Sequence, residues 1–138
     1  MDVKSPSQAF CEIPHSADIA IEVTGENLNQ LFMHAAEGLF HVMGIETISD
    51  HTSEKEMEIQ EGDKESLLVA FLSELIYEAG NGIYFRALNL QVEEKELHAR
   101  LAGFPILRQQ RDIKAVTYHQ ASVEKTEDGW KARVVFDV

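Results

Sequence analysis

Two short segments near opposite ends of the chain carry side chains that could bind a cation. The first is His15-Ser16-Ala17-Asp18, where an imidazole and a carboxylate lie three residues apart. Such groups can form an acid–base pair or contribute ligands to a metal site. A turn in which Ser16 or Asp18 bonds to nearby backbone explains the same four residues without any chemistry. From this segment alone, the turn is the better interpretation.

The second segment is the end of the chain, Asp137-Val138, where Val138 carries the terminal carboxylate. If the last strand is docked in a sheet, that carboxylate is held in place. Two oxygen donors at a fixed strand end suit a hard cation such as Ca²⁺ or Mg²⁺. Most terminal acids are simply solvated, so this segment too is a weak signal when taken alone.

Two basic features precede this end of the chain. Lys114 leads the β-forming segment Lys114-Ala115-Val116-Thr117-Tyr118-His119 and could hold a carboxylate or a phosphate. A lysine that protects a sheet edge from aggregation is the ordinary alternative. The segment 108–111 has two arginines and could contact RNA or an acidic partner, although solvated arginines are commoner.

The overall charge limits the class of partner. Lys and Arg total 12 and Asp and Glu total 24, which gives a net charge of −12. Nucleic-acid binding depends on neutralising phosphates with Lys and Arg, so this balance argues against strong direct binding to RNA or DNA. A basic protein partner or cations fit better, although simple solubility explains the charge equally well.

The cysteine content and the hydropathy pattern predict the compartment. The single cysteine, Cys11, cannot form an internal disulfide and fits a reducing cytosol. No signal-peptide pattern and no apolar run of membrane-spanning length are found, so we predict a cytoplasmic protein without a membrane partner. Gly-rich phosphate loops, zinc-type Cys/His spacing and hydrolase motifs are also absent from the sequence.

Two amphipathic helices are predicted from the apolar pattern. Apolar residues at helical spacing predict one helix over 28–43, with Asn27 as N-cap and Gly44 as its stop. A second helix is predicted from the cap Asp63 to Ala79, and 80–82 breaks it.

Alternating patterns predict the strands. One covers 19–24, a short charged one surrounds Met57, and 83–92 forms a hairpin with 97–101. Residues 103–112 are expected to form a polar, basic-leaning loop. Two final strands are predicted over 113–124 and 130–138.

The element order predicts an α+β fold with two helices packed on a mixed or antiparallel sheet. We expect residues 1–10 to be a flexible N-terminal tail and 11–138 to form a single domain, because no linker-like segment interrupts the chain.

Taken in order, these segments resemble the archease family. The segments that carry the resemblance are His15-Ser16-Ala17-Asp18, Leu31-Phe32-Met33-His34-Ala35-Ala36, Leu67-Leu68-Val69-Ala70-Phe71-Leu72-Ser73-Glu74-Leu75, the segment from Lys114 to His119, and Asp137-Val138. The match runs from about Glu12 to the last residue. Ser16 stands where the family usually has Thr. The family usually has acidic and histidine residues before Lys114, where this chain has Gly103-Phe104-Pro105-Ile106-Leu107-Arg108.

The resemblance implies a strand–helix–strand–strand fold with an inserted portion, and a non-catalytic role. Archeases activate RtcB-type RNA ligases in tRNA splicing and RNA repair, promoting guanylylation and multiple turnover. The ligase itself does the chemistry, with Mn²⁺ and GTP. Carried over by position, Asp18, Asp137 and Val138 would bind a divalent cation such as Ca²⁺, Mg²⁺ or Mn²⁺. His15 and Lys114 would be second-rank functional residues beside them.

Two other functions compete with this interpretation. One is a metal-dependent phosphoester hydrolase that uses Asp18, Asp137 and His15, against which the lack of a convincing nucleophile–base pair counts. The other is a chaperone-like module that binds several RNA-processing proteins and does not need these aspartates.

Overall fold

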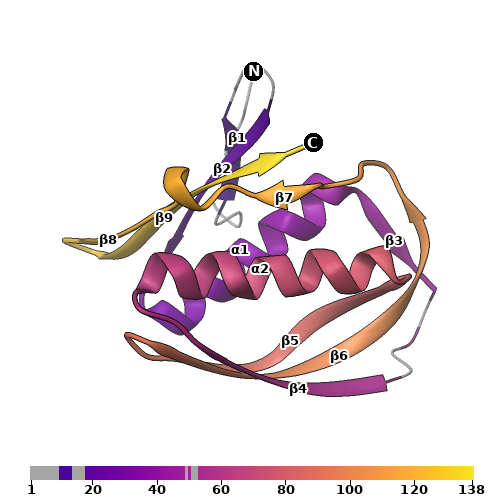
Figure 1. The fold of residues 1–138 in the computed structure, drawn as a ribbon, viewed down its shortest axis with the longest axis horizontal. Coiled ribbons are helices and arrows are strands. Elements are labelled where there is room, and N and C mark those ends of the chain that lie inside the picture. The colour runs from indigo at the N-terminus through magenta and orange to yellow at the C-terminus, as the bar shows by residue number, and fades with distance from the viewer. Residues whose placement is uncertain (1–9, 14–17, 49, 51–52) are drawn as a thin grey trace.

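The computed structural model describes residues 10–13, 18–48, 50 and 53–138 (Figure 1). In chain order, the elements are β1 (Phe10–Ile13), β2 (Asp18–Gly25), α1 (Leu28–Met43), β3 (Ile45–Thr47), β4 (Ser53–Gln60), α2 (Lys64–Gly80), β5 (Ile83–Val92), β6 (Glu96–Gln109), β7 (Ala115–Val116), the 3₁₀ helix η1 (Tyr118–Gln120), β8 (Ser122–Thr126) and β9 (Gly129–Asp137). Within this part of the chain, neither α-helix is long and apolar enough to cross a membrane.

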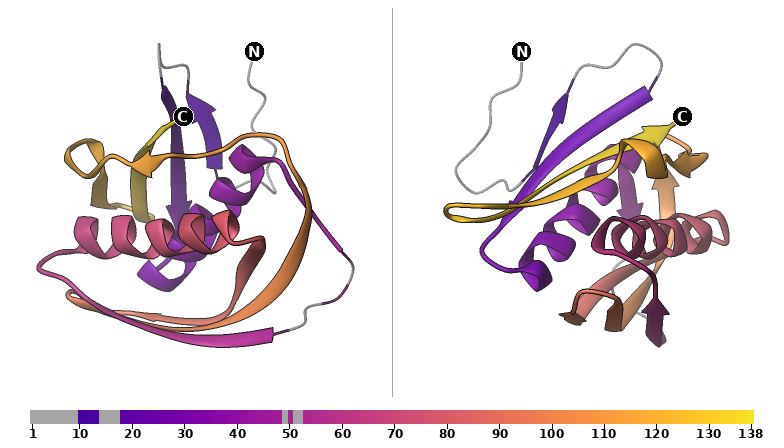
Figure 2. Two further views of the ribbon diagram at one scale, coloured as in Figure 1. Left: turned by 45° about the vertical axis from the view of Figure 1, so that its right-hand side comes forward. Right: turned by 60° about the vertical axis from the view of Figure 1, so that its left-hand side comes forward.

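The strands form two antiparallel sheets with both α-helices between them (Figures 1 and 2). In the five-stranded sheet the order is β1-β2-β9-β7, and β8 also pairs with β9. In the four-stranded sheet the long strand β6 pairs with β3, β4 and β5. The predicted α+β class with antiparallel pairing is confirmed, and the structure adds that the helices are covered by a sheet on each side.

Both helices begin where the sequence predicts; α1 also ends as predicted, and α2 ends one residue later, at Gly80. The Asn27 side chain accepts a hydrogen bond from the Gln30 N–H (2.8 Å), and the Asp63 side chain accepts one from the Ser66 N–H (2.7 Å). At the end of α1, Gly44 adopts φ 61°, a left-handed conformation that glycine takes without steric cost.

The core lies where the inner faces of the two sheets meet the helices. Its largest fully buried side chains include Phe32 and Phe71, which stack with ring centroids 6.2 Å apart, and Phe136 of β9. Burial of a phenylalanine side chain stabilises a fold by about 1.5–3 kcal/mol. This core therefore holds β9 firmly against the helices.

The predicted loop over 103–112 is wrong for most of its length. Strand β6 continues to Gln109, and its last residues pair with β3. Pro105 sits where β6 passes from β4, which pairs up to Gly103, to β3, which pairs from Ile106. The Pro105 carbonyl accepts a hydrogen bond from Ile48 N–H (2.9 Å), so this part of the strand remains paired.

The arginines of segment 108–111 have structural partners. Arg111 donates through Nη1 to the Val42 carbonyl (3.0 Å) and through its backbone N–H to the Met43 carbonyl (3.1 Å). Both carbonyls belong to the last turn of α1, where a positive charge also interacts favourably with the helix dipole. Arg108 forms an exposed ion pair with Glu46 (3.4 Å). These contacts anchor β6 to the end of α1.

The predicted strand over 113–124 is also wrong, because η1 interrupts it. Val116 and Val123 are both buried, yet they are an odd number of residues apart. In one continuous strand they would point to opposite faces. The 3₁₀ turn at Tyr118–Gln120 resets the alternation, so that both valines reach the core.

Candidate functional site

Strands β2 and β9 place Asp18 and Asp137 directly opposite each other. The two residues are the first pair of an antiparallel ladder that runs from Asp18↔Asp137 to Gly25↔Trp130. The pairs Ile19↔Phe136, Ile21↔Val134 and Val23↔Ala132 alternate with this polar pair and pack toward the helices. A slip of one residue would turn these side chains out of the core. The core therefore fixes the position of the two aspartates.

Because they are opposite one another, the two aspartates point to the same face of the sheet. Directly opposed Cβ atoms in an antiparallel pair lie about 4.5–5.5 Å apart, close enough for both carboxylates to contact one ion. Asp18 is half-buried and Asp137 is exposed. On the other side of Asp137, β7 presents the exposed Ala115, whose methyl group leaves the carboxylate accessible.

The start of β7 holds the end of β9 in place. Lys114 donates its backbone N–H to the Asp137 carbonyl (2.7 Å). Thr117 donates both its backbone N–H (2.9 Å) and its hydroxyl (2.8 Å) to the Val135 carbonyl. The segment that contains Lys114 is thus attached by hydrogen bonds to the strand that ends in Asp137, and the Lys114 side chain is exposed.

Val138 and His15 are the remaining predicted site residues. Val138 follows Asp137, the last residue of β9, and is 37% exposed. His15 lies outside the described residues, as does the rest of its motif up to Asp18. Of the five predicted site residues, the structure brings Asp18, Asp137, Val138 and the backbone of Lys114 to one end of the five-stranded sheet.

The chemistry of these donors fits a hard divalent cation. Among the described residues, no group of three or more His, Cys, Asp and Glu side chains could hold a metal ion. What the structure places together is two carboxylates, Asp18 and Asp137, from directly paired strands, with Val138 following Asp137 in the chain. Carboxylate and carbonyl oxygens are the ligands that Ca²⁺, Mg²⁺ and Mn²⁺ prefer.

Sequence reasoning missed the contact between η1 and the start of α2. The Tyr118 hydroxyl donates to Asp63 Oδ2 (3.3 Å), the same carboxylate that caps α2. The Ser66 N–H lowers the pKa of Asp63 most, and the hydrogen bond from Tyr118 lowers it further. The Val123 N–H donates to Glu65 on the first turn of α2 (3.1 Å). The segment from β7 to β8 is therefore attached to α2 as well as to β9.

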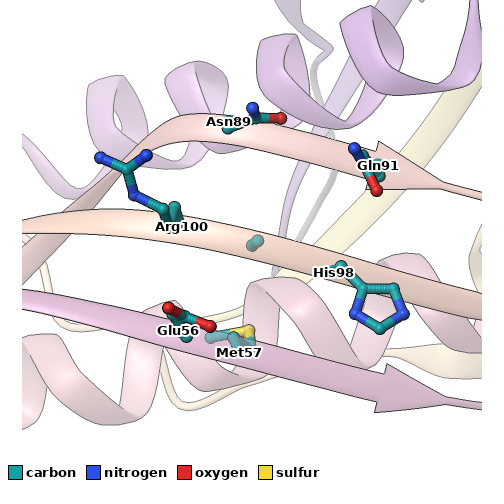
Figure 3. Close-up of a pocket in the computed structure, with 7 residues that line it drawn as sticks. Glu56, Met57, Asn89, Gln91, His98 and Arg100 are labelled. Atoms are coloured by element: carbon teal, nitrogen blue, oxygen red, sulfur yellow. The ribbon is translucent and has the colours of Figure 1, made fainter.

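A second polar surface lies on the outer face of the four-stranded sheet (Figure 3). A hollow of about 160 Å³ there is lined by polar side chains of β4, β5 and β6, among them Glu56, Asn89, Gln91, His98 and Arg100. The His98 ring lies between Glu96 (3.3 Å) and Glu58 (3.8 Å). Carboxylates on both sides of the imidazole make this face unsuited to an anionic ligand.

Comparison with known proteins agrees with the sequence resemblance. Residues 10–138 match the Archease protein family (MTH1598/TM1083). The chain belongs to the archease family. The archease of Methanosarcina barkeri is 36% identical over 148 residues, which span 99% of this chain and 100% of the relative. That of Thermococcus kodakarensis is 33% identical, over 90% of this chain and 94% of the relative.

Two solved structures share the archease fold. A crystal structure from Thermotoga maritima, described as an archease and possible chaperone, has a TM-score of 0.68 and 28% identity. The alignment covers 100% of this chain and 99% of the Thermotoga maritima chain. The solution structure of Methanobacterium thermoautotrophicum protein 1598 has a TM-score of 0.73 and 25% identity, over 95% and 99% of the two chains. The two-sheet architecture is therefore shared along nearly the whole chain.

Proposed function

We propose that this archease-family chain activates an RtcB-type RNA ligase, promoting its guanylylation and multiple turnover, and that a divalent cation at Asp18 and Asp137 is part of that role. The observation that carries the proposal is the register of β2 and β9, which places two aspartates from opposite ends of the chain side by side. Family membership supports the role, and the oxygen donor set supports the cation.

In this proposal Asp18, Asp137 and the main-chain oxygens of Val138 hold the cation. Two carboxylates on one face of adjacent strands repel each other, and a cation between them relieves that repulsion. A bound cation would supply a positive centre at an otherwise acidic surface, to which carboxylate groups of a ligase or phosphate groups of its substrates can bind. The exposed Lys114 side chain adds a second positive charge, and we assign His15 to the same site.

The neighbouring hydroxyl groups support a non-catalytic role. A hydrolase that attacked with a side-chain hydroxyl at this site would need that hydroxyl and a base within hydrogen-bond reach of each other. The Thr117 hydroxyl donates to the Val135 carbonyl, and the Tyr118 hydroxyl donates to Asp63, which caps a helix. Both hydroxyl groups thus hold structural elements together, which favours an accessory protein over an enzyme.

A chaperone-like role is the second candidate, because the Thermotoga maritima relative is described as a possible chaperone. A chaperone would bind several clients through a broad surface and would not need the aspartate pair. The two roles therefore differ in their response to loss of either carboxylate.

Multiple-turnover ligation tests the proposal. The cognate ligase, at limiting concentration, joins RNA ends that carry a cyclic phosphate, with and without this protein. We expect stimulation by the wild type, at least a tenfold loss with Asp18→Asn or Asp137→Asn, and full stimulation with Asp128→Asn. Asp128 is a matched control because it is an exposed aspartate in the turn before β9, at the opposite end of the same strand.

Three outcomes would contradict the proposal. Equal stimulation by all variants would remove the cation site from the mechanism and favour the chaperone role. Absence of stimulation with an active ligase would contradict the ligase role. Cleavage of a phosphoester by the isolated protein, lost with Asp137→Asn, would establish the hydrolase instead.

A further inference from the structure

A groove runs along the free edge of β4, on the far side of the molecule's helical layer from the aspartate pair. It has a volume of about 670 Å³ and is lined by β4 from Lys55 to Gln60 and by Ala70, Ser73 and Glu74 of α2. The small side chains of Ala70 and Ser73 leave space between helix and strand. Lys55 spans this space at one end, where it pairs with Glu78 of α2.

The open side of the groove is a sheet edge. Strand β4 pairs only with β6 among the described residues, so half of its backbone N–H and C=O groups face outward without a strand partner. Such a row of groups is a template for adding another strand. Peptide segments bind to exposed sheet edges in this way, through main-chain hydrogen bonds and alternating side-chain contacts.

The side chains of β4 specify what kind of strand fits. Glu54, Glu56 and Glu58 alternate along the outer face, while Met57 and Ile59 face α2. Residues of an added strand would lie directly opposite these side chains, at about 4.5–5.5 Å between Cβ atoms. Lys or Arg would therefore be favoured opposite the glutamates, and small apolar residues opposite Met57 and Ile59.

The same glutamates exclude a second copy of this chain. Pairing β4 with another β4 would set glutamates against glutamates, and like charges directly opposite each other are destabilising. Arg100 pairs with Glu54 (3.7 Å) and His98 lies 3.8 Å from Glu58, but no ion pair to Glu56 is found among the described residues. The edge thus retains negative charge that selects for a basic strand and against an acidic one.

We propose that the free edge of β4, with the adjoining face of α2, binds an extended segment of a partner protein in which basic and small apolar residues alternate. The segment adds to the four-stranded sheet as a fifth strand. This inference is independent of the ligase role and of the aspartate pair, which lies on the other sheet.

The test uses a synthetic ten-residue peptide of alternating Arg and Val and two comparison peptides. One has the same side chains with all peptide nitrogens methylated, which prevents strand pairing. The other has the same composition with the arginines in one block. Binding is measured by NMR titration of the full-length, isotopically labelled protein, together with hydrogen exchange of the β4 amides.

We expect the alternating peptide to shift the β4 and α2 resonances and to slow exchange of the β4 amides. Both comparison peptides should bind at least tenfold more weakly. The variant Glu54→Gln/Glu56→Gln/Glu58→Gln should weaken binding of the alternating peptide about tenfold. The variant Glu124→Gln/Glu127→Gln/Asp128→Asn should not, although it changes the net charge equally, because these exposed residues lie on the β8–β9 hairpin of the other sheet.

Several results would overturn the proposal. Equal binding of the three peptides would mean that charge alone attracts them. Shifts confined to other elements, or no binding, would show that β4 is not the docking edge. A dimer in solution, with β4 amides protected before any peptide is added, would assign the edge to a second copy.

Discussion

The two sheets use acidic residues in different ways. In the five-stranded sheet, Asp18 and Asp137 come from strands at opposite ends of the chain and meet because the core fixes the register of β2 against β9. In the four-stranded sheet, Glu54, Glu56 and Glu58 follow one another along a single edge strand. The first arrangement concentrates two carboxylates at one point, while the second spreads three along an edge.

This difference matters for the ligands each sheet can bind. Converging carboxylates suit a small, highly charged ion, because several oxygens can contact it at once. Glutamates spaced along a strand suit an extended basic segment, because each meets its own cross-strand partner. The comparison also predicts which substitutions affect each arrangement. The position of the aspartate pair depends on the core behind it, and the position of the three glutamates depends on how firmly β4 is held against α2.

Disrupting the core behind the aspartate pair should have the largest effect. Phe136 is fully buried and precedes Asp137, so Phe136→Ala should lower the free energy of unfolding by about 3–5 kcal/mol, as measured by urea denaturation. Leu88 of β5 is 49% exposed, and Leu88→Ala should change the free energy of unfolding by less than about 0.5 kcal/mol. Comparable losses in the two variants would show that the core does not hold β9 as described.

A smaller effect is expected where β4 is held against α2. Lys55 Nζ lies 2.5 Å from a Glu78 carboxylate oxygen, and both side chains are partly buried. Glu78→Gln should cost about 1 kcal/mol and speed hydrogen exchange in β4. Glu74, at 4.0 Å and 46% exposed, is the matched control, and Glu74→Gln should leave β4 exchange unchanged. The attachment of β4 to α2 would be in doubt if both variants behaved alike.

The smallest predicted effect concerns pH and the Asp63 cap of α2. The pKa of Asp63 is lowered from 3.8 in the folded protein, chiefly by the Ser66 N–H. A carboxyl group whose pKa is lowered by folding stabilises the protein at pH values above its pKa in the unfolded chain. This contribution is lost as the pH falls through the pKa of the folded protein. An asparagine side chain can also cap a helix but does not titrate. The melting temperature of Asp63→Asn should therefore lie slightly below that of the wild type at pH 6 and approach it below pH 3. A constant difference between pH 6 and pH 2.5 would contradict this account.

The helices, their caps and the α+β class could be predicted from the sequence because their signals are local. Asn27, Gly44 and Asp63 act within one helical turn, and the apolar stripes repeat over several turns. The errors involve interactions between segments distant in sequence. Strand β6 extends past Gly103 because β3 pairs with it, and η1 exists because Val116 and Val123 must both reach the core.

The pairing of Asp18 with Asp137 likewise could not be predicted from local sequence signals. Neither His15-Ser16-Ala17-Asp18 nor Asp137-Val138 indicates by its own spacing that the two segments meet, because strand pairing between chain ends leaves no local pattern. The resemblance to archeases predicted that the two segments form one site. The register of β2 and β9 explains why Asp18 and Asp137 lie together. The assignment of a cation, and of His15 and Lys114 to the same site, stays a prediction.

Calorimetric titration with Mn²⁺ tests most directly whether Asp18 and Asp137 form one cation site. The proteins compared are the wild type, Asp18→Asn, Asp137→Asn, the double variant and the control Asp128→Asn. If the two carboxylates share one ion, either single substitution should abolish most of the binding, the double variant should lose little more, and the control should bind like the wild type. Wild-type affinity in both single variants, or losses that simply add in the double variant, would contradict the account.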